Sequence, residues 1–194
     1  MFSILILDVS GSMRNYYKRL FDITNEIIKK QMENEENEGV VILFGDYAKT
    51  VINGKYRLLE YDKDIINLPG IFGGTNFFKA FTEAEKYICN KKKFLKKRIL
   101  FLTDGKSDSS KLKPISDRMV KESFQINIIG FENNYDYFGE NKSASSFEKN
   151  KKTKKKTSVS SFEHLREFAS ENCFFTSNNF KEIEIIIKDI YAAE

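Results

Sequence analysis

The sequence has few of the residues that build zinc sites, disulfide scaffolds and catalytic triads. Its 194 residues contain one histidine, His164, and two cysteines, Cys89 and Cys173. These three residues leave a tetrahedral structural zinc site incomplete, and two cysteines do not make a disulfide framework. We expect both cysteines to be small buried apolar residues and His164 to lie at the surface or half-buried. A Ser-His-Asp hydrolase would have to use His164, which falls in a predicted helix away from the strand ends.

Long apolar runs and processing signals are lacking as well. No window approaches the ~20 apolar residues that a membrane-spanning helix needs. The apolar run Phe2–Leu7 is too short for a signal peptide and has no basic residues before it. We therefore expect a cytoplasmic chain, unless the sequence is a piece of a larger protein. Prolines are scarce and phenylalanines and tyrosines are abundant, so the composition indicates a globular protein.

The positive net charge comes from one segment. Six lysines lie between Lys149 and Lys156, and without them the chain would be slightly acidic. These lysines belong to residues 139–160, which have little periodic apolar content. We predict a mobile insert there, within a single domain that spans residues 1–194. A lysine run of this kind is most often a solvated loop, and the alternative is that it binds nucleic acid or another anionic surface.

Short apolar runs alternate with helical patterns along the chain. Runs such as Phe2–Leu7 are continuous and contain β-branched residues, which is typical of strands buried on both faces. The order of elements predicts an α/β fold with a doubly wound, mostly parallel six-stranded sheet, one short antiparallel strand and helices on both faces. We expect strands at 2–7, 40–45, 49–52, 97–103, 124–131 and 173–176, and helices at 13–32, 76–90, 107–123, 161–171 and 178–194, with a short helix near 62–67.

Two local predictions concern the surroundings of the helix that starts at Asn76. Its first part carries Phe77, Phe78 and Phe81, and we predict that all three face the core. Asp46 lies in the sequence GDYA between two predicted strands. We interpret it as a turn residue of a hairpin.

Oxygen-bearing side chains occur where predicted strands end. Asp8, Ser10 and Ser12 follow the first strand, Asp104 follows a later one, and Thr75 precedes a helix. The carboxyl ends of parallel strands meet at one edge of a sheet, and ligands bind beyond that edge. Alternate residues of an extended segment face one way, so the first three side chains can point to one spot. Hard oxygen donors without imidazole or thiolate suit Mg²⁺.

Three motifs resemble those of the metal-ion-dependent adhesion site of the von Willebrand factor A domain. They are DVSGSM from Asp8, GGTNF from Gly73 and LTDG ending at Gly105, and the order and spacing match from Ile4 to Ile190. Taken alone, the first motif would be read as helix capping and the last as a turn. The three motifs together favour the metal site, and the resemblance implies the family's Rossmann-like fold.

The resemblance also implies roles for these residues. Ser10, Ser12 and Thr75 would offer hydroxyls to the ion, with Thr75 sometimes acting through water. Asp8 and Asp104 would act largely through water or as hydrogen-bond acceptors behind the ligands. The expected ion is Mg²⁺, with Mn²⁺ or Ca²⁺ as alternatives, and its open position would take a Glu or Asp of a protein partner of this monomer. The expected partner-binding rim is made of Gly11, Met13, Gly74, Asn76 and Gly105.

Two other functions fit parts of the sequence. Acidic residues with Mg²⁺ at the end of a parallel sheet also serve hydrolysis and phosphoryl transfer. However, no lysine follows a glycine-rich loop, and DVSGS has serine where an aspartyl-phosphate phosphatase would carry its second aspartate. A binder of nucleic acid or an anionic surface would use Lys149–Lys156, which lacks interleaved aromatic residues. We predict a metal-dependent protein-interaction module rather than an enzyme, with no bound nucleic acid.

Overall fold

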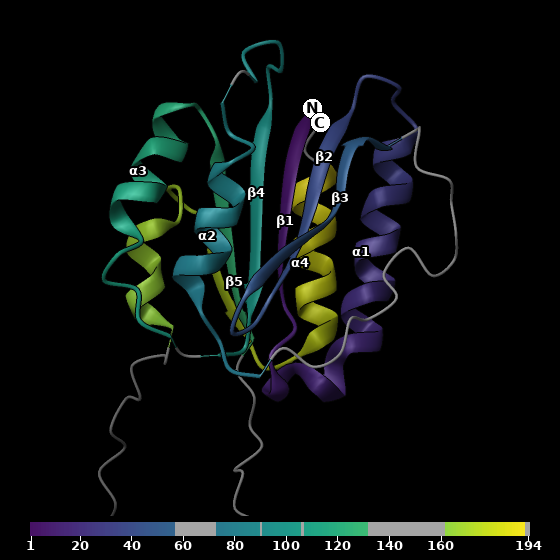
Figure 1. Ribbon diagram of the computed structural model, residues 1–194. Helices are drawn as coiled ribbons and strands as arrows, with labels where there is room; N and C mark the ends of the chain where they lie inside the picture. The colour runs from purple at the N-terminus through teal and green to yellow at the C-terminus, as the bar shows by residue number, and fades with distance from the viewer. Residues whose placement is uncertain (57–72, 90, 106, 132–161, 193–194) are drawn as a thin grey trace, which may run out of the picture.

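A central sheet is covered by helices on both faces in the computed structural model of the chain (Figure 1). The structure describes residues 1–56, 73–89, 91–105, 107–131 and 162–192. The strands within these ranges are β1 (Phe2–Asp8), β2 (Glu38–Phe44), β3 (Ala48–Lys55), β4 (Lys97–Thr103), β5 (Gln125–Phe131) and β6 (Phe174–Ser177). They form one sheet in the order β3-β2-β1-β4-β5-β6.

Neighbouring strands of the sheet run parallel, except that β3 pairs antiparallel with β2. Leu7 of β1 lies opposite Leu43 of β2 on one side and Leu102 of β4 on the other. The carboxyl ends of these three strands therefore meet at one edge of the sheet, which is the lower end in Figure 1. The predicted α/β fold, mostly parallel with one antiparallel strand at the edge, is confirmed.

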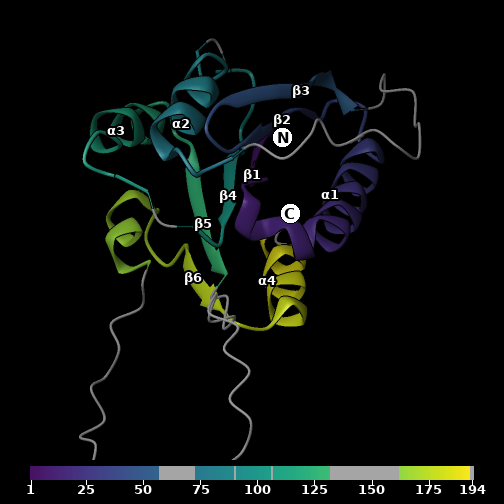
Figure 2. The same ribbon diagram turned by 60° about the horizontal axis from the view of Figure 1, so that its bottom comes forward.

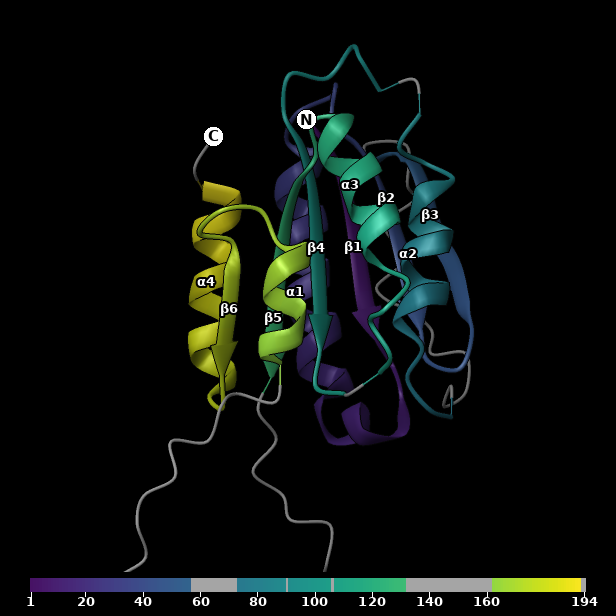
Figure 3. The same cartoon turned by 90° about the vertical axis from the view of Figure 1, so that its left-hand side faces the viewer.

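The helices form two layers on the sheet. They are the 3₁₀ helix η1 (Gly11–Tyr16), α1 (Tyr17–Met32), α2 (Phe77–Glu85), α3 (Lys113–Lys121), the 3₁₀ helix η3 (Glu163–Phe168) and α4 (Phe180–Ala192). α1 and α4 lie on one face, as the end-tilted view shows (Figure 2). α2, α3 and η3 lie on the other face, which is turned to the front in the side view (Figure 3). None of the described helices is both long and apolar enough to cross a membrane.

Alternating side chains of the strands build two separate cores. Leu5 and Leu7 of β1 belong to the cluster that includes residues of α1 and α4. Ile4 and Ile6, which point the other way, belong to the cluster that includes residues of α2, α3 and η3. Because both faces of the strand are covered, apolar residues are favoured at every position, and this explains the apolar run Ile4–Leu7 of β1. The buried hydroxyl of Ser3 is hydrogen-bonded to Tyr56.

Several helices are shorter than the sequence pattern predicts. The helix expected at 107–123 covers only Lys113–Lys121, with Pro114 in its first turn. Before it, the Asp108 carboxylate accepts a hydrogen bond from the Ser110 N–H (2.9 Å), and such side-chain turns compete with helix formation. The element expected at 161–171 is the six-residue 3₁₀ helix η3.

The other helix boundaries differ by up to five residues. The helix expected at 13–32 begins with the 3₁₀ turns of η1, a common form of a helix start. The helix expected at 76–90 ends at Glu85. α4 starts after Asn179, whose side-chain oxygen accepts a hydrogen bond from the Lys181 N–H (3.0 Å) and caps the helix. The short helix expected near 62–67 and the insert at 139–160 lie outside the described residues.

One prediction about the α2 phenylalanines is wrong. Phe77 and Phe81 are fully buried, whereas Phe78 is 40% exposed. An α-helix turns by about 100° per residue, so Phe78 points well away from the direction shared by the other two.

The predictions for the cysteines and the histidine fare differently. Cys173 is buried as expected, but Cys89 is exposed just beyond α2, so its predicted burial is wrong. His164 is half-buried on η3, as expected, with its ring stacked near that of Phe77 (6.4 Å between centroids).

Gly39 of β2 provides a test of the core packing. A β-carbon added there would lie 2.0 Å from the hydroxyl oxygen of Tyr56 and 2.7 Å from the carbonyl oxygen of Ser3. Tyr56 is fully buried and its hydroxyl is hydrogen-bonded to Ser3 Oγ (2.7 Å), so neither neighbour moves easily. We predict that Gly39→Ala lowers the free energy of unfolding by about 2–3 kcal/mol, measured by urea unfolding followed by circular dichroism.

Tyr56→Phe serves as the control for this substitution. It removes the nearest clashing atom, but the ring carbon that carried the hydroxyl would remain 2.4 Å from the added β-carbon. The double variant should therefore regain only part of the lost stability. A Gly39→Ala protein as stable as the native one would contradict this packing.

Candidate functional site

The ends of β1 and β4 place two carboxylates and a threonine side by side. Asp8 is the last residue of β1 and is completely buried. One of its carboxylate oxygens accepts a hydrogen bond from the Ser10 N–H (2.8 Å), and the other accepts one from the Thr103 hydroxyl. The Thr103 oxygen in turn accepts the N–H of Gly105 (3.0 Å). Asp8 therefore joins the loop after β1 to the loop after β4.

A chain of hydrogen bonds connects the predicted oxygen donors. Ser12 Oγ donates to Asp104 Oδ1 (2.7 Å), and Ser10 Oγ lies 3.1 Å from Ser12 Oγ. Because the hydroxyl hydrogen of Ser12 is used by Asp104, Ser10 is the donor in the second contact. Ser10 is buried, while Ser12 and Asp104 are half-buried. The structure thus brings together four of the five predicted ligands through direct contacts, with Asp8 bonded to the backbone of Ser10.

Thr75 reaches the same place from the loop before α2. A β-carbon added at Gly105 would lie 2.7 Å from Thr75 Oγ1, so the threonine hydroxyl packs directly over the backbone that follows Asp104. Only a glycine leaves room for it. Thr75 is half-buried, and the next residue, Asn76, caps α2 by accepting the N–H of Lys79 (3.0 Å). The fifth predicted ligand therefore lies beside the other four.

Backbone hydrogen bonds hold the three loops against one another. The N–H of Gly11 donates to the carbonyl of Gly73 (3.0 Å), and the N–H of Asn76 donates to the carbonyl of Gly45 (2.9 Å). Gly73 adopts a positive φ of 27°, which favours glycine. The backbone of Gly73 therefore lies close to that of Gly11.

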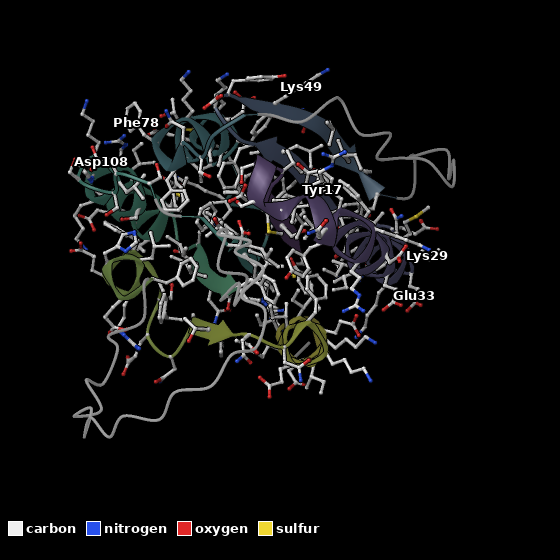
Figure 4. The ribbon with its side chains drawn as sticks, turned by 90° about the horizontal axis from the view of Figure 1, so that it is seen from below. Tyr17, Lys29, Glu33, Lys49, Phe78 and Asp108 are labelled. Atoms are coloured by element: carbon white, nitrogen blue, oxygen red, sulfur yellow. The ribbon has the colours of Figure 1, made fainter. Side chains whose placement is uncertain are left out.

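Two residues of the site have roles that the sequence did not indicate. Asp46 lies in the β2–β3 turn, as predicted, but its carboxylate also occupies the space that side chains at Gly73 and Gly74 would need. The Tyr17 hydroxyl contacts the carbonyls of Val9 (2.6 Å) and Ser10 (2.8 Å) and so fixes the path of the first loop. The sequence does not show where the Tyr17 side chain points, because this depends on the rotation of α1 about its own axis. Figure 4 looks onto this end of the sheet, with Tyr17 near its middle.

The residues of the predicted rim differ in how deeply they are buried. Gly74 is exposed, and Gly11 and Asn76 are half-buried at the surface of the site. Gly105 is buried beneath Thr75. Met13 is completely buried in the core with α1, so its assignment to the rim is wrong. Met13 lies within the 3₁₀ helix η1, and the helical turn there directs its side chain into the core.

Burial dominates the electrostatics of the site. It raises the pKa of Asp8 from 3.8 to about 6, against the lowering effect of hydrogen bonds from Ser10 and Thr103. Repulsion from Asp104 also raises this pKa, but it is the smallest of the causes. The two carboxylates therefore repel each other, and desolvation is the larger effect. Among the described residues, Asp8 forms no ion pair with a lysine or arginine.

The donor set fits a hard divalent cation. Three hydroxyls and two carboxylates meet at this edge, and oxygen atoms are the preferred ligands of Mg²⁺, Mn²⁺ and Ca²⁺. Over the described part of the chain, no group of three or more His, Cys, Asp or Glu side chains could hold a metal. Any ion bound here would depend on hydroxyl oxygens.

The first half of the chain matches a known protein family. A model of the von Willebrand factor type A domain matches residues 3–106, which include β1 to β4 and the three loops of the site. The chain belongs to the von Willebrand factor type A family. No curated protein sequence matches the chain.

Solved structures resemble this von Willebrand factor type A fold at low sequence identity. Proximal thread matrix protein 1 from the mussel byssus, with a zinc-occupied MIDAS motif, is 19% identical over 98% of this chain and 44% of its own, with a TM-score of 0.69. The pilus adhesin SpaC from Lactobacillus rhamnosus GG is 12% identical over 99% of this chain and 29% of its own (TM-score 0.69). The VWA domain of SpRpn10 is 16% identical over 95% and 93% (TM-score 0.61).

The first two of these structures are much longer than this chain. The chain spans less than half of the mussel protein and less than a third of the pilus adhesin. At these identities the likeness concerns the fold alone.

The raised pKa of Asp8 leads to a test of the metal-free protein. The pKa is higher in the folded than in the unfolded chain, so the folded chain holds the proton more tightly. Stability should therefore be highest below pH 4, fall as the pH rises towards 6, and level off above it. We predict that the unfolding free energy of the native protein relative to Asp8→Asn falls by at most about 3 kcal/mol over this range.

Urea unfolding in EDTA at a series of pH values measures this difference. Asparagine keeps the shape of the side chain, and the Thr103 hydroxyl can accept from its amide, so Asp8→Asn should fold. Other titrating groups contribute equally to both proteins and cancel. A difference between the two proteins that does not change between pH 4 and pH 7 would contradict the buried carboxylate.

Proposed function

We propose that the chain is a divalent-cation-dependent protein-interaction domain, which binds an acidic side chain of a partner through an ion held at the ends of β1 and β4. The observation that carries the proposal is the meeting of five oxygen-bearing side chains from three loops at one edge of the sheet. Ser12, Thr75 and Asp104 are half-buried, so an ion among them would face the solvent and an incoming partner.

Each residue has a part in holding the ion. Ser10, Ser12 and Thr75 would offer hydroxyl oxygens to Mg²⁺, with Mn²⁺ or Ca²⁺ as alternatives. Asp104 accepts the hydrogen of Ser12 and so orients its oxygen lone pairs. Asp8 holds the first loop in shape by accepting from its backbone and supplies negative charge next to the site. The bound ion would supply a positive centre with an open position for a carboxylate.

Two comparisons support this proposal. The similar mussel byssus protein has a zinc-occupied MIDAS motif, and another similar structure is a pilus adhesin. Both are distant in sequence, so their metals and partners are not transferred to this chain. The proposal rests on the donor set of the chain itself.

Metal binding by single-hydroxyl variants tests the ion site. We predict that the native protein binds Mn²⁺ in calorimetry and that its thermal midpoint rises when Mn²⁺ is added. Ser12→Ala and Thr75→Ala each remove one hydroxyl ligand and should weaken binding by about tenfold or more. Both variants should remain folded, because these side chains lie at the edge of the core.

The control for the metal test is Ser110→Ala. Ser110 is an exposed serine in the turn before α3 and lies outside the site, so its variant should bind Mn²⁺ as the native protein does. If all three variants bind Mn²⁺ with the native affinity, the ion site is elsewhere.

Partner binding distinguishes an interaction module from an enzyme. A protein captured from a cell extract by the native chain in Mg²⁺ should be released by EDTA and should not bind Thr75→Ala. Changing the essential Glu or Asp of that partner to its amide should remove most of the affinity, because a neutral oxygen is a poorer ligand for a hard dication. A hydrolase would instead bind its substrate almost normally in Thr75→Ala and lose turnover. Capture that is equally strong in EDTA would refute the metal-dependent interaction.

A further inference from the structure

A small pocket lies next to the candidate metal site and has no role in it. It has a volume of about 240 Å³ and is lined by Tyr47, Ala48, Phe78, Lys79, Thr82 and Glu83. The pocket lies between the start of β3 and the outer side of α2. Both walls continue from loops of the metal site, since Tyr47 follows Asp46 and Phe78 comes three residues after Thr75. Figure 4 looks onto this end of the sheet, with Tyr17 near the middle and Phe78 towards the margin.

Two exposed aromatic side chains form the walls of this pocket. Tyr47 is 51% exposed and Phe78 is 40% exposed, whereas their neighbours Phe77 and Phe81 are fully buried. A single exposed apolar residue needs no explanation, but two aromatic residues on different elements that face one pocket form a patch of the kind found at interaction sites. Thr82 also lines the pocket, and its hydroxyl has no hydrogen-bond partner among the described residues. The exposed parts of these side chains can therefore contact another molecule.

The charges beside the pocket favour a partner segment that is acidic. Lys79 lines the pocket and is exposed, and the ammonium of Lys111 lies 5.8 Å from the centre of the Phe78 ring. The one acidic side chain that lines the pocket, Glu83, is engaged by Lys86 and by the hydroxyl of Thr50 (2.7 Å). Its charge is therefore largely compensated. Asp46, which precedes Tyr47, is also acidic, but its carboxylate lies beside Gly73 and Gly74 of the metal site.

We propose that this pocket, defined by Tyr47, Phe78 and Lys79, receives a large apolar side chain of the partner that supplies the ligating carboxylate. The inference rests on the proposed metal-dependent function and specifies the partner. The partner is an acidic segment in which an aliphatic or aromatic residue stands near the Glu or Asp that binds the ion. The carboxylate provides the metal dependence, and the apolar residue selects among acidic segments.

The chain length between the two sites limits the spacing in the partner. Phe78 comes three positions after Thr75, so their Cα atoms are at most about 11 Å apart. An extended peptide advances about 3.3 Å per residue. The apolar residue should therefore lie within about four positions of the ligating acid.

A displayed library of short peptides that share one fixed glutamate tests this inference. The library is selected on the native protein in millimolar Mn²⁺, and the affinities of the selected peptides are measured by fluorescence anisotropy. We expect large apolar residues to be enriched at one spacing from the glutamate. Replacing that residue by alanine should weaken binding about tenfold to a hundredfold. Phe78→Ser and Tyr47→Ser should lose the same factor while they keep native Mn²⁺ affinity.

Val120→Ser is the matched control for these variants. Val120 is 51% exposed on α3 and does not line the pocket, so its substitution also removes an exposed apolar side chain but should leave peptide selection unchanged. Both aromatic variants should fold, because both side chains are partly exposed and neither belongs to the two core clusters.

The outcomes separate this inference from the proposed function. Selected peptides that bind only with Mn²⁺ but show no apolar preference, or the same preference with Phe78→Ser, would refute the pocket and leave the metal-dependent function standing. Peptides that bind equally in EDTA would refute the function and, with it, the partner described here. If the native chain self-associates and Phe78→Ser does not, sedimentation would show that a second copy of this chain occupies the pocket, and the inference would be wrong.

Discussion

The buried carboxylate of Asp8 is the interaction on which the geometry of this edge depends. A carboxylate without a cation beside it is costly to bury, and here it is stabilised by the N–H of its own loop and by the hydroxyl of Thr103 on the neighbouring strand. These two bonds tie the loop after β1 to the loop after β4. This connection sets the positions of Ser10, two residues after Asp8, and of Asp104, which follows Thr103. Ser12 is held between them, because its hydroxyl contacts both.

The position of Asp8 depends in turn on the parallel register of the sheet. A register slip of one residue between β1 and β4 would turn every side chain of the strand to the other face. Apolar side chains on both faces would not by themselves prevent such a slip, because Leu5 and Ile6 are equally buried. Polar groups at the strand ends do discriminate, since Asp8 and Thr103 can meet only when Leu7 lies opposite Leu102. The same contact therefore serves both the fold and the site.

Much of the fold could be predicted from the sequence because its signals are local. A strand buried on both faces favours a run of apolar residues, and β1, β2 and β4 each contain at least four in succession, while β5 is apolar at most of its positions. The site residues could be predicted because each follows the end of such a strand or precedes a helix. The exceptions have physical reasons. Phe78 and Met13 depend on the rotational phase of short helical turns, which a run of apolar letters does not specify, and the turn at Asp108 replaces helix through a side-chain hydrogen bond. The contact of Asp46 with Gly73 and Gly74 joins residues that are distant in sequence.

The loop before α2 is joined to the loop after β1 and to the β2–β3 turn through main-chain atoms. The pairs Gly11–Gly73 and Gly45–Asn76 are linked by N–H and carbonyl groups, and these groups are present whatever the side chains are. A substitution at an exposed position such as Tyr47, Phe78 or Lys79 leaves those links in place. Residues around the metal site can therefore change during evolution without altering the arrangement of these loops. After a gene duplication, a few surface mutations are enough to change the recognised partner, while the metal site stays the same.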